Sequence, residues 1–266
     1  MKKIFLLFCT LFLFTSNVFA ASINVQEESG IYHIILSGNS IKKQIQFVST
    51  VGLKTNKEIH DLTKSKLTIN TGFFDPMNQK TISYIVNKGV IIEDPYTNEN
   101  IFTNPILRQN LSKIINRSEF RILDCGGKFK YSITSHNTPV EFGCNIETSA
   151  QGGPQLLPEL RLEEEFFILK DDEGNIKRQS ASVLDKTART IIGLKGDDVH
   201  ILIITNKNPK TIFEARDLCK SLGLHYAMAF DGGSSTSFDY KDIHITSIQK
   251  FNEDTGRRLK SFMIIK

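Results

Sequence analysis

Tryptophan is absent from the 266 residues, and neither sign of charge is in large excess. The 19 phenylalanines must therefore supply most of the aromatic packing. The formal net charge is +4, and it falls to +2 if Lys2 and Lys3 are removed with the N-terminal segment described below. So small a charge does not favour nucleic acid or an anionic membrane surface as a partner. We expect a globular protein that binds no nucleic acid.

After residue 20 the sequence also lacks an apolar run long enough to cross a bilayer, which takes about 20 residues. The longest candidate, 191–205, is interrupted by Gly193, Lys195, Gly196 and two aspartates. We therefore expect no transmembrane segment in the mature chain.

Residues 1–20 have the pattern of a secretory signal peptide. Lys2 and Lys3 precede an almost continuous apolar stretch, 4–14, which is too short to span a bilayer. Val18-Phe19-Ala20 then places small residues three and one positions before a cleavage point. The pattern predicts export, in a bacterial style, to the periplasm or beyond.

Cysteine and histidine pairs at metal-binding spacing are missing too. The sequence contains no CxxC and no HExxH motif, so a zinc site is the weaker interpretation of its cysteines. In an oxidising compartment we expect Cys125 and Cys144 to form a disulfide, worth about 3 kcal/mol in the chain-entropy model. Cys219 falls within an amphipathic helix pattern, which predicts a buried free thiol.

What the sequence does contain is a series of short apolar runs of strand length. They occupy 31–36, 45–48, 67–74, 82–92, 120–123, 166–170, 190–194, 199–205, 226–230, 243–248 and 262–265. Lys195-Gly196-Asp197-Asp198 is a hairpin signal between two of them. The acidic run 171–175 is a second hairpin signal. It lacks the full spacing of an EF-hand calcium loop, so we interpret it as a solvated turn.

The clearest helix covers 211–222, with Ile212, Ala215 and Cys219 on one face and Gly223 at its end. It links the predicted strands 199–205 and 226–230, which resembles a β-α-β crossover. A second helical pattern covers 105–116. We predict an α/β (or α+β) fold: a single domain with a mixed β-sheet, the crossover near the C-terminus and flanking helices. Residues 21–66 supply its N-terminal strands, and 67–266 form its main part.

Three short motifs combine glycine or arginine with aromatic and polar residues. In 70–76, Asn-Thr-Gly-Phe-Phe-Asp-Pro, an amide and two rings suit a sugar. In 150–157, two glycines allow a ligand to approach the backbone closely. At the start of a predicted strand, Arg189 suits a phosphate or carboxylate. Each motif alone also fits an ordinary structure: core phenylalanines with an Asp-Pro turn, a Gly-Gly-Pro turn, and a surface arginine.

The fourth motif is AFDGGSSTSF, residues 229–238. Asp231 stands at the carboxyl end of the strand that follows the crossover helix, where open α/β sheets bind ligands. Two glycines and four small hydroxyl residues follow it. The motif is either a polar turn or a loop shaped to hold an oxygen-rich ligand.

In their order along the chain, the four motifs resemble the phosphodiester glycosidase family. They read Asn-x-Gly-Phe-Phe-Asp, Gln-Gly-Gly-Pro, Ala-Arg-Thr-x-x-Gly and Asp-Gly-Gly-Ser-Ser-Thr. The resemblance runs from about Leu67 to the C-terminus, where 257–262 looks like the family's closing strand. Residues 116–121 and 153–160 look like bacterial members, including cyanobacterial ones.

Two positions depart from the family pattern. Thr71 stands where members usually have glycine, and the loop after Asp231 is one glycine shorter than in many members. These departures weaken the prediction of a particular substrate more than they weaken the prediction of the reaction class.

The resemblance implies hydrolysis of a sugar–phosphate bond in glycosyl phosphodiesters of glycans or exopolysaccharide, with N-acetylglucosamine as one candidate sugar. Asp231 suits a base, or a carboxylate facing the positively charged sugar, Arg189 suits the phosphate, and Asn70 suits a sugar hydroxyl or acetamide. Asp75 and Glu93 are also eligible as the base or nucleophile. The expected substrate-binding residues are Gly72, Phe73, Asp75, Gly152, Gly153, Gly232, Gly233, Ser234 and Ser235, the glycines through their amides.

Two functions of other classes stay open. One is a non-catalytic protein that binds glycans or assembles exopolysaccharide on the same fold. The other is a metal-dependent phosphodiesterase, against which none of the six histidines lies in a paired ligand spacing. We expect no cofactor, with a divalent ion near Asp231 as the alternative.

Overall fold

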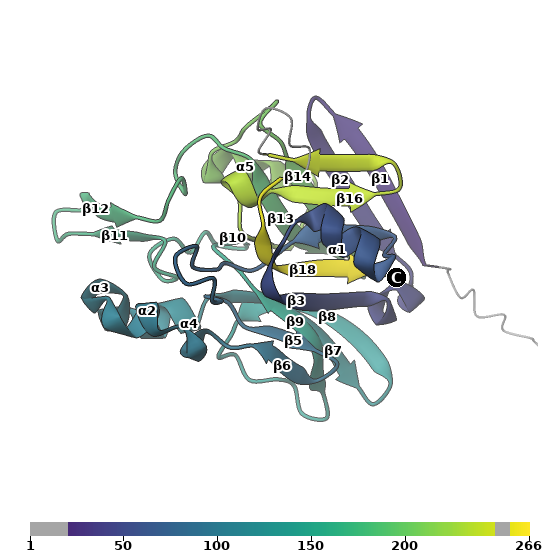
Figure 1. The fold of residues 1–266 in the computed structure, drawn as a ribbon, viewed down its shortest axis with the longest axis horizontal. Helices are drawn as coiled ribbons and strands as arrows, with labels where there is room; N and C mark the ends of the chain where they lie inside the picture. Colours follow the sequence, from purple (N-terminus) through teal and green to yellow (C-terminus); the bar gives the residue numbers. More distant parts are fainter. Residues whose placement is uncertain (1–20, 248–255) are drawn as a thin grey trace, which may run out of the picture.

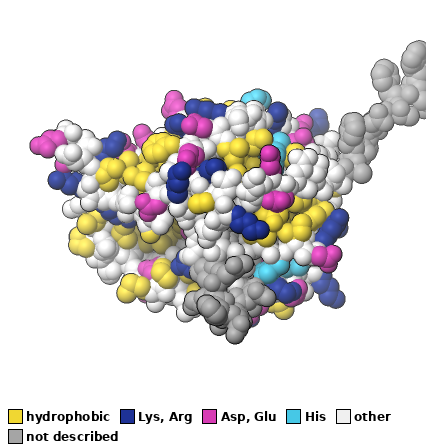
Figure 2. All heavy atoms as spheres, turned by 90° about the horizontal axis from the view of Figure 1, so that it is seen from above, with side chains coloured by type: hydrophobic (Ala, Val, Ile, Leu, Met, Phe, Trp, Pro, Cys, Tyr) yellow, Lys and Arg dark blue, Asp and Glu magenta, His cyan; other side chains and the backbone are white. Residues whose placement is uncertain are grey.

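The computed structural model describes residues 21–247 and 256–266. The signal peptide predicted for 1–20 lies outside these ranges. Within them, no helix has the length and apolarity that crossing a membrane requires. The described chain is mostly strand, arranged as three main sheets and a two-stranded arm (Figure 1). On the face seen from above, charged side chains of both signs are interspersed with apolar ones (Figure 2).

The first sheet contains the strands that lead to Asp231, and every neighbouring pair in it is antiparallel. In spatial order its strands are β1 (Ser22–Glu28), β2 (Ile31–Ser37), β14 (Asp198–Ile204), β13 (Arg189–Lys195), β15 (Tyr226–Ala229) and β10 (Gln155–Leu157).

The second sheet contains the last strand of the described chain. Its order is β17 (Ile243–Thr246), β16 (Ser237–Tyr240), β4 (Leu67–Asn70), β18 (Leu259–Ile265) and β3 (Ile45–Lys54). The third sheet has the order β6 (Val90–Glu93), β5 (Ile85–Asn87), β9 (Asn145–Gln151), β7 (Ser118–Cys125) and β8 (Lys128–Ser135). The arm pairs β11 (Ile168–Lys170) with β12 (Ile176–Gln179).

The expected mixed sheet is wrong in its detail, because all the strand pairs of the described chain are antiparallel. The crossover helix, α5 (Ile212–Ser221), does connect two parallel strands, β14 and β15. β13 lies between them and runs antiparallel to both. The crossover therefore spans one inserted strand.

Most predicted strands are present, with changed boundaries. The 67–74 strand ends at Asn70, and the 82–92 run is the β5–β6 hairpin. Both predicted hairpin turns are confirmed, by β13–β14 and by β11–β12. Six strands were not predicted: β1, β8, β9, β10, β12 and β16. Ile248, the last residue of the predicted 243–248 strand, lies outside the described residues.

The helices follow local signals. α5 begins with a capping box, in which Thr211 Oγ1 accepts from Glu214 N while the Glu214 carboxylate accepts from Thr211 N. The predicted 105–116 helix is divided at Asn110 into α3 (Pro105–Gln109) and α4 (Leu111–Ile115). The remaining helices are α1 (Asn56–Thr63), α2 (Glu99–Thr103) and the 3-10 turns η1 (Asn39–Lys43), η2 (Pro95–Thr97) and η3 (Gly233–Ser235).

One apolar core joins the three sheets, so the described chain behaves as one body. Ile34 comes from the first sheet, Phe47 and Phe238 from the second, and Phe120 from the third. A second cluster fills the space between α5 and the first sheet and includes the buried free thiol of Cys219, as predicted. The predicted disulfide between Cys125 and Cys144 is also confirmed.

Candidate active site

A pocket of about 160 Å³ gathers residues from all four motifs. Phe73 comes from the first motif, Gly153 from the second, Arg189 from the third and Asp231 from the fourth. Arg257, from the segment before β18, completes its polar wall. Segments that lie far apart in the sequence thus meet at the end of β15.

The Asp231 backbone is held in the pocket by two hydrogen bonds to the first motif. Its N–H donates to the Thr71 carbonyl at 2.8 Å, and its own carbonyl accepts from Asn70 Nδ2 at 2.6 Å. The side chain is partly exposed, at the pocket wall. Burial raises the pKa of Asp231 to about 6, opposed by the Ser235 hydroxyl, the Arg257 charge and the Gly232 N–H. The carboxyl can therefore exchange a proton near neutral pH.

Asn70 lies behind the pocket rather than in its wall. Its side chain is 1% exposed, and its Oδ1 accepts from Thr190 Oγ1 at 2.7 Å and from Ser237 N at 3.1 Å. With Nδ2 bound to the Asp231 carbonyl, this amide ties β4, β13 and β16 to the Asp231 loop. Asn70 is placed to fix the position of Asp231.

Arg189 lines the pocket while binding backbone carbonyls of the loop beside it. Nε donates to Lys210 O at 3.2 Å, and Nη2 donates to the carbonyls of Ser182, Val183 and Asp185 at 2.7 to 3.1 Å. Burial lowers the pKa of Arg189 to about 10, so it stays charged at neutral pH. Nη1 makes no hydrogen bond within the described ranges and is the donor left for a ligand.

Arg257 is a pocket residue that the sequence reasoning did not select. Its Nη1 donates to Ser234 Oγ at 2.8 Å and to Ser235 Oγ at 3.2 Å, and its guanidinium stacks 5.1 Å from the Phe74 ring centre. The available signal was the resemblance of 257–262 to the family's closing strand. Its location follows from the pairing of β18 with β4, which puts Phe262 opposite Asn70.

The glycine amides expected to hold a phosphate are mostly used by the fold itself. Gly152 N donates to Ser118 O at 2.9 Å, Gly153 N to Ala229 O at 2.8 Å, and Gly233 N to Ala188 O at 2.8 Å. A side chain at Gly152 would place its Cβ 2.6 Å from the Ala229 carbonyl, so this glycine permits close strand packing. The Gly232 N–H instead faces the Asp231 carboxylate.

The other expected residues divide between the pocket and its support. Phe73 and Ser234 line the pocket, and Ser235 lies buried behind Ser234. Gly72 lies outside the lining, with its N–H donating to Ser261 Oγ at 3.1 Å. Asp75 Oδ1 closes a turn by accepting from Met77 N at 2.8 Å.

One carboxylate lines the pocket among the described residues, although three were eligible as the base or nucleophile. Asp75 accepts from Met77 and Asn100, and Glu93 forms an ion pair with Lys260 Nζ at 3.2 Å; neither lines the pocket. Of the three, Asp231 is the carboxylate that lines the pocket.

A grouping of potential metal ligands occurs once in the described part of the chain, at Cys125, Glu141 and Cys144. The two sulfurs are joined in the disulfide, so they are not free to bind an ion.

Comparison with known proteins addresses the family and the fold. A family model described as phosphodiester glycosidase matches residues 63–266. No curated protein matches the chain. Among solved structures, the catalytic domain of zebrafish N-acetylglucosamine-1-phosphodiester α-N-acetylglucosaminidase is similar, with a TM-score of 0.64 at 13% identity. The match covers 94% of this chain and 84% of that one.

Two bacterial structures share the fold as well. A Synechocystis protein has a TM-score of 0.57 at 13% identity, over 92% of this chain and 61% of that one. A Burkholderia pseudomallei protein described as exported has a TM-score of 0.59 at 10% identity, over 88% of this chain and 73% of that one.

Proposed function

Since this chain belongs to the phosphodiester glycosidase family, we propose that it is a hydrolase that cleaves the bond between the anomeric carbon of a sugar and a phosphodiester oxygen. The observation that carries the proposal is the composition of the pocket: among the described residues it is lined by one carboxylate, Asp231, whose pKa is raised, and by the two arginines Arg257 and Arg189.

A site with one carboxylate suits a phosphate leaving group. Glycosidases that act on ordinary glycosides use two carboxyl groups, because the departing sugar oxygen must be protonated by one of them. A phosphate leaves as a stable anion and needs cationic hydrogen-bond donors instead of an acid. Arg257 and the free Nη1 of Arg189 supply such donors at the pocket wall.

In the proposed reaction the oxygen of a water molecule bonds to the anomeric carbon, and the bond from that carbon to the phosphate oxygen breaks. The bonding electron pair leaves with the phosphate, which the two arginines hold. Asp231, ionised above about pH 6, accepts the proton of the water. In the alternative, the Asp231 carboxylate faces the positive charge on the sugar ring, and the proton of the water passes to the solvent. The Phe73 ring offers an apolar face to the sugar.

We further propose that the protein acts after export, on glycosyl phosphodiesters of glycans or exopolysaccharide. The signal pattern of 1–20 supports export, and so does the Cys125–Cys144 disulfide, since such bonds persist in oxidising compartments. The similarity to a bacterial protein described as exported agrees with this location.

The test is turnover of a panel of sugar-1-phosphodiesters, including N-acetylglucosamine 1-phosphodiesters, in ¹⁸O water. Free sugar that carries the label supports cleavage at the anomeric carbon. Label in the phosphate, with activity lost on addition of a chelator, would establish the metal-dependent phosphodiesterase instead. Binding of the same compounds without turnover would establish a glycan-binding protein.

A further inference from the structure

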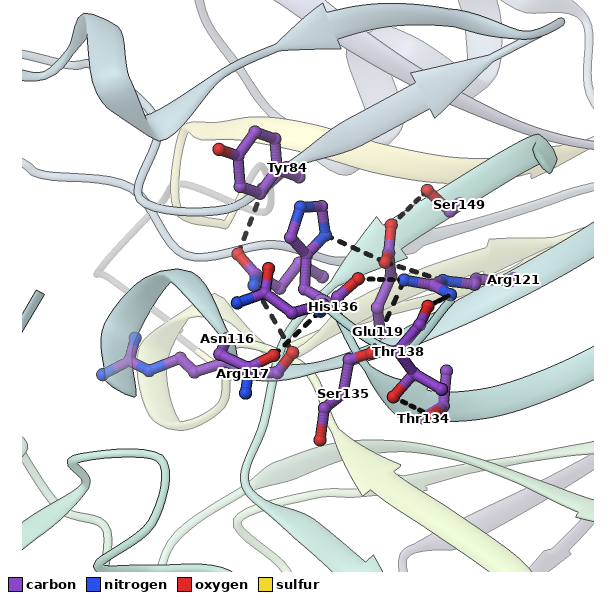
Figure 3. A network of polar contacts seen from close by, with 12 residues as sticks. Tyr84, Asn116, Arg117, Glu119, Arg121, Thr134, Ser135, His136, Thr138 and Ser149 are labelled. Atoms are coloured by element: carbon purple, nitrogen blue, oxygen red, sulfur yellow. Dashed lines mark hydrogen bonds and ion pairs between the residues drawn. The ribbon is translucent and has the colours of Figure 1, made fainter. Parts of the chain in front are cut away.

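A second arginine site adjoins the pocket, and the proposed reaction does not use it. Arg117, just before β7, is 6% exposed, and its guanidinium carbon lies 4.2 Å from the ring centre of Phe167 and 5.6 Å from that of Phe73. Both rings line the pocket. The Arg117 side chain also points away from the neighbouring polar network (Figure 3).

The hydrogen-bonding capacity of Arg117 is largely unused. Nε donates to the Glu165 carbonyl at 3.0 Å, while Nη1 and Nη2 make no hydrogen bond to any part of the chain that the structure describes. Burial lowers the pKa of Arg117 to about 10, so the group stays charged at neutral pH. A buried cation with idle donors is costly unless an anion accepts from them.

Glu165 is an internal candidate for that anion, and its charge raises the pKa of Arg117, but its carboxylate forms no hydrogen bond or ion pair with Arg117 in the described chain. Its Oε1 accepts from Ser118 Oγ at 2.6 Å and from Gln155 N at 3.2 Å. Its Oε2 is buried without a partner. Burial raises the pKa of Glu165, which moves this carboxyl toward its neutral form. Arg117 therefore has a carboxyl nearby, but no anion accepts a hydrogen bond from its Nη1 or Nη2 within the described residues.

A second positive charge lies close to the first. Arg178, on β12 of the arm, stacks 4.4 Å from the Phe166 ring centre and donates from Nη1 to Phe166 O at 3.2 Å. Its charge is near enough to lower the pKa of Arg117 further. Phe166 and Phe167 are adjacent, so the two guanidinium groups stack on neighbouring rings of one short segment. Two like charges this close favour a shared anionic ligand.

We propose that Arg117 and Arg178 form a second anion subsite beside the pocket, which binds a carboxylate or phosphate that the substrate carries beyond the bond to be cleaved. The planar Nη pair of Arg117 suits two parallel hydrogen bonds to such an oxyanion. The inference rests on the proposed function, and it narrows the substrate to chains with a repeated negative charge, either acidic sugars or further phosphodiesters.

The kinetic test uses sugar-1-phosphodiesters that differ only in the aglycone: neutral, carrying a carboxylate, or carrying a second phosphate. Arg117→Met and Arg178→Gln should raise KM for a charged aglycone by about 10- to 100-fold, the range for one hydrogen bond to a charged group. KM for the neutral aglycone should stay unchanged. The charged substrate with the larger effect identifies the source of the anion.

Arg216→Gln is the matched control, because Arg216 on α5 pairs with Asp217 at 2.9 Å and its loss removes the same charge. An equal rise in KM for neutral and charged substrates would show that Arg117 only supports the fold. Unchanged KM values for every substrate would overturn the subsite. If circular dichroism shows that Arg117→Met does not fold, Arg178→Gln alone tests the subsite, because Arg178 is half-buried on the arm.

A binding measurement separates this inference from the proposed function. If no sugar-1-phosphodiester is turned over, calorimetry with methyl glucuronide, methyl glucoside and glycerol phosphate still tests the subsite. We expect the two anions, but not the glucoside, to bind the wild-type protein. Arg257→Gln should retain binding of the glucuronide, while Arg117→Met and Arg178→Gln should lose it. Failure of both anions to bind the wild-type protein would overturn the subsite whatever the reaction is.

Discussion

Glu119 and Asp231 are two carboxylates with similar kinds of partner but opposite electrostatic outcomes. Glu119, on β7, is fully buried; its Oε2 accepts from Arg121 Nε at 2.9 Å and from His136 Nδ1 at 3.0 Å (Figure 3). Its Oε1 accepts from the Ser149 hydroxyl. Burial alone would raise the pKa of Glu119, but the His136 hydrogen bond and the Arg121 charge hold it below its ordinary value.

Around Asp231 burial prevails instead. The Ser235 hydroxyl and the Arg257 charge act in the same direction as the partners of Glu119, yet the pKa of Asp231 stays raised, at about 6. The Asp231 carboxyl also adjoins an open pocket. A fully compensated carboxylate holds strands together, whereas an under-compensated one beside a cavity is available for chemistry.

The largest expected effect is loss of catalysis in Asp231→Asn. We expect kcat to fall by about 10²- to 10⁴-fold, the usual contribution of a general acid or base. The amide keeps the shape of the side chain, and the contacts that hold the loop are backbone contacts, so the circular dichroism spectrum should not change. Wild-type turnover by the folded variant would show that Asp231 is not the catalytic group.

Glu119→Gln should have the opposite effect to Asp231→Asn: a loss of stability with little change in turnover. Arg121 would lose its counter-charge in a buried site, and removing one partner of a buried ion pair costs about 3–5 kcal/mol of unfolding free energy. Turnover per folded molecule should remain near that of the wild type. Urea denaturation monitored by circular dichroism gives the stability change. A variant of normal stability but low turnover would place Glu119 in the reaction and break the comparison.

Arg257→Gln tests the link between the Asp231 carboxyl and its cation. We expect kcat/KM to fall by about 10- to 100-fold, as for the loss of a hydrogen bond to a charged group. The wild-type pH–rate profile should rise with a midpoint near the Asp231 pKa of about 6. Because the Arg257 charge lowers that pKa, the midpoint should move upward in the variant.

The next residue provides the control for this experiment. Arg258 is exposed and pairs with Glu58 at 3.3 Å, so Arg258→Gln removes the same charge without touching the pocket. Equal losses of activity in the two variants would indicate a general effect of charge rather than a contact with the phosphate.

Local patterns placed Asp231 just after the strand that follows the crossover helix, as the structure has it. These patterns are a capped helix with an apolar face, a glycine at its end, and a strand that ends two residues before Asp231. Cysteine count and compartment were sufficient for the disulfide. These features depend on neighbours in the sequence, or on the few pairings that three cysteines allow.

Features that depend on distant strand pairing could not be read in the same way. Arg257 reaches the pocket because β18 pairs with β4 and β3, a register that no local periodicity encodes. The insertion of β13 between β14 and β15 is of the same kind, and it made the expected mixed sheet wrong. Polar residues in a motif also do not reveal their partners: the Asn70 amide and three glycine N–H groups are used by the fold.

The smallest expected effect is on stability, and its sign separates the two carboxylates. The folded pKa of Asp231 lies above its ordinary value of 3.8, so the native state loses stability as the pH rises from about 4 to about 6. Asp231→Asn has no such loss and should be more stable than the wild type at about pH 8, by roughly 1–2 kcal/mol after allowance for partial exposure. The difference should vanish below about pH 4.

The folded pKa of Glu119 lies below its ordinary value, so its contribution is present at neutral pH and is lost as the pH falls through that lowered pKa. The stability deficit of Glu119→Gln should therefore shrink on acidification, whereas the stability gain of Asp231→Asn should appear on raising the pH. Urea titrations of both variants and the wild type across this range measure the two slopes. Slopes of the same sign, for the stability difference against pH, would mean that partners offset the burial of both carboxylates to the same degree. The electrostatic reason for assigning the chemistry to Asp231 would then be lost.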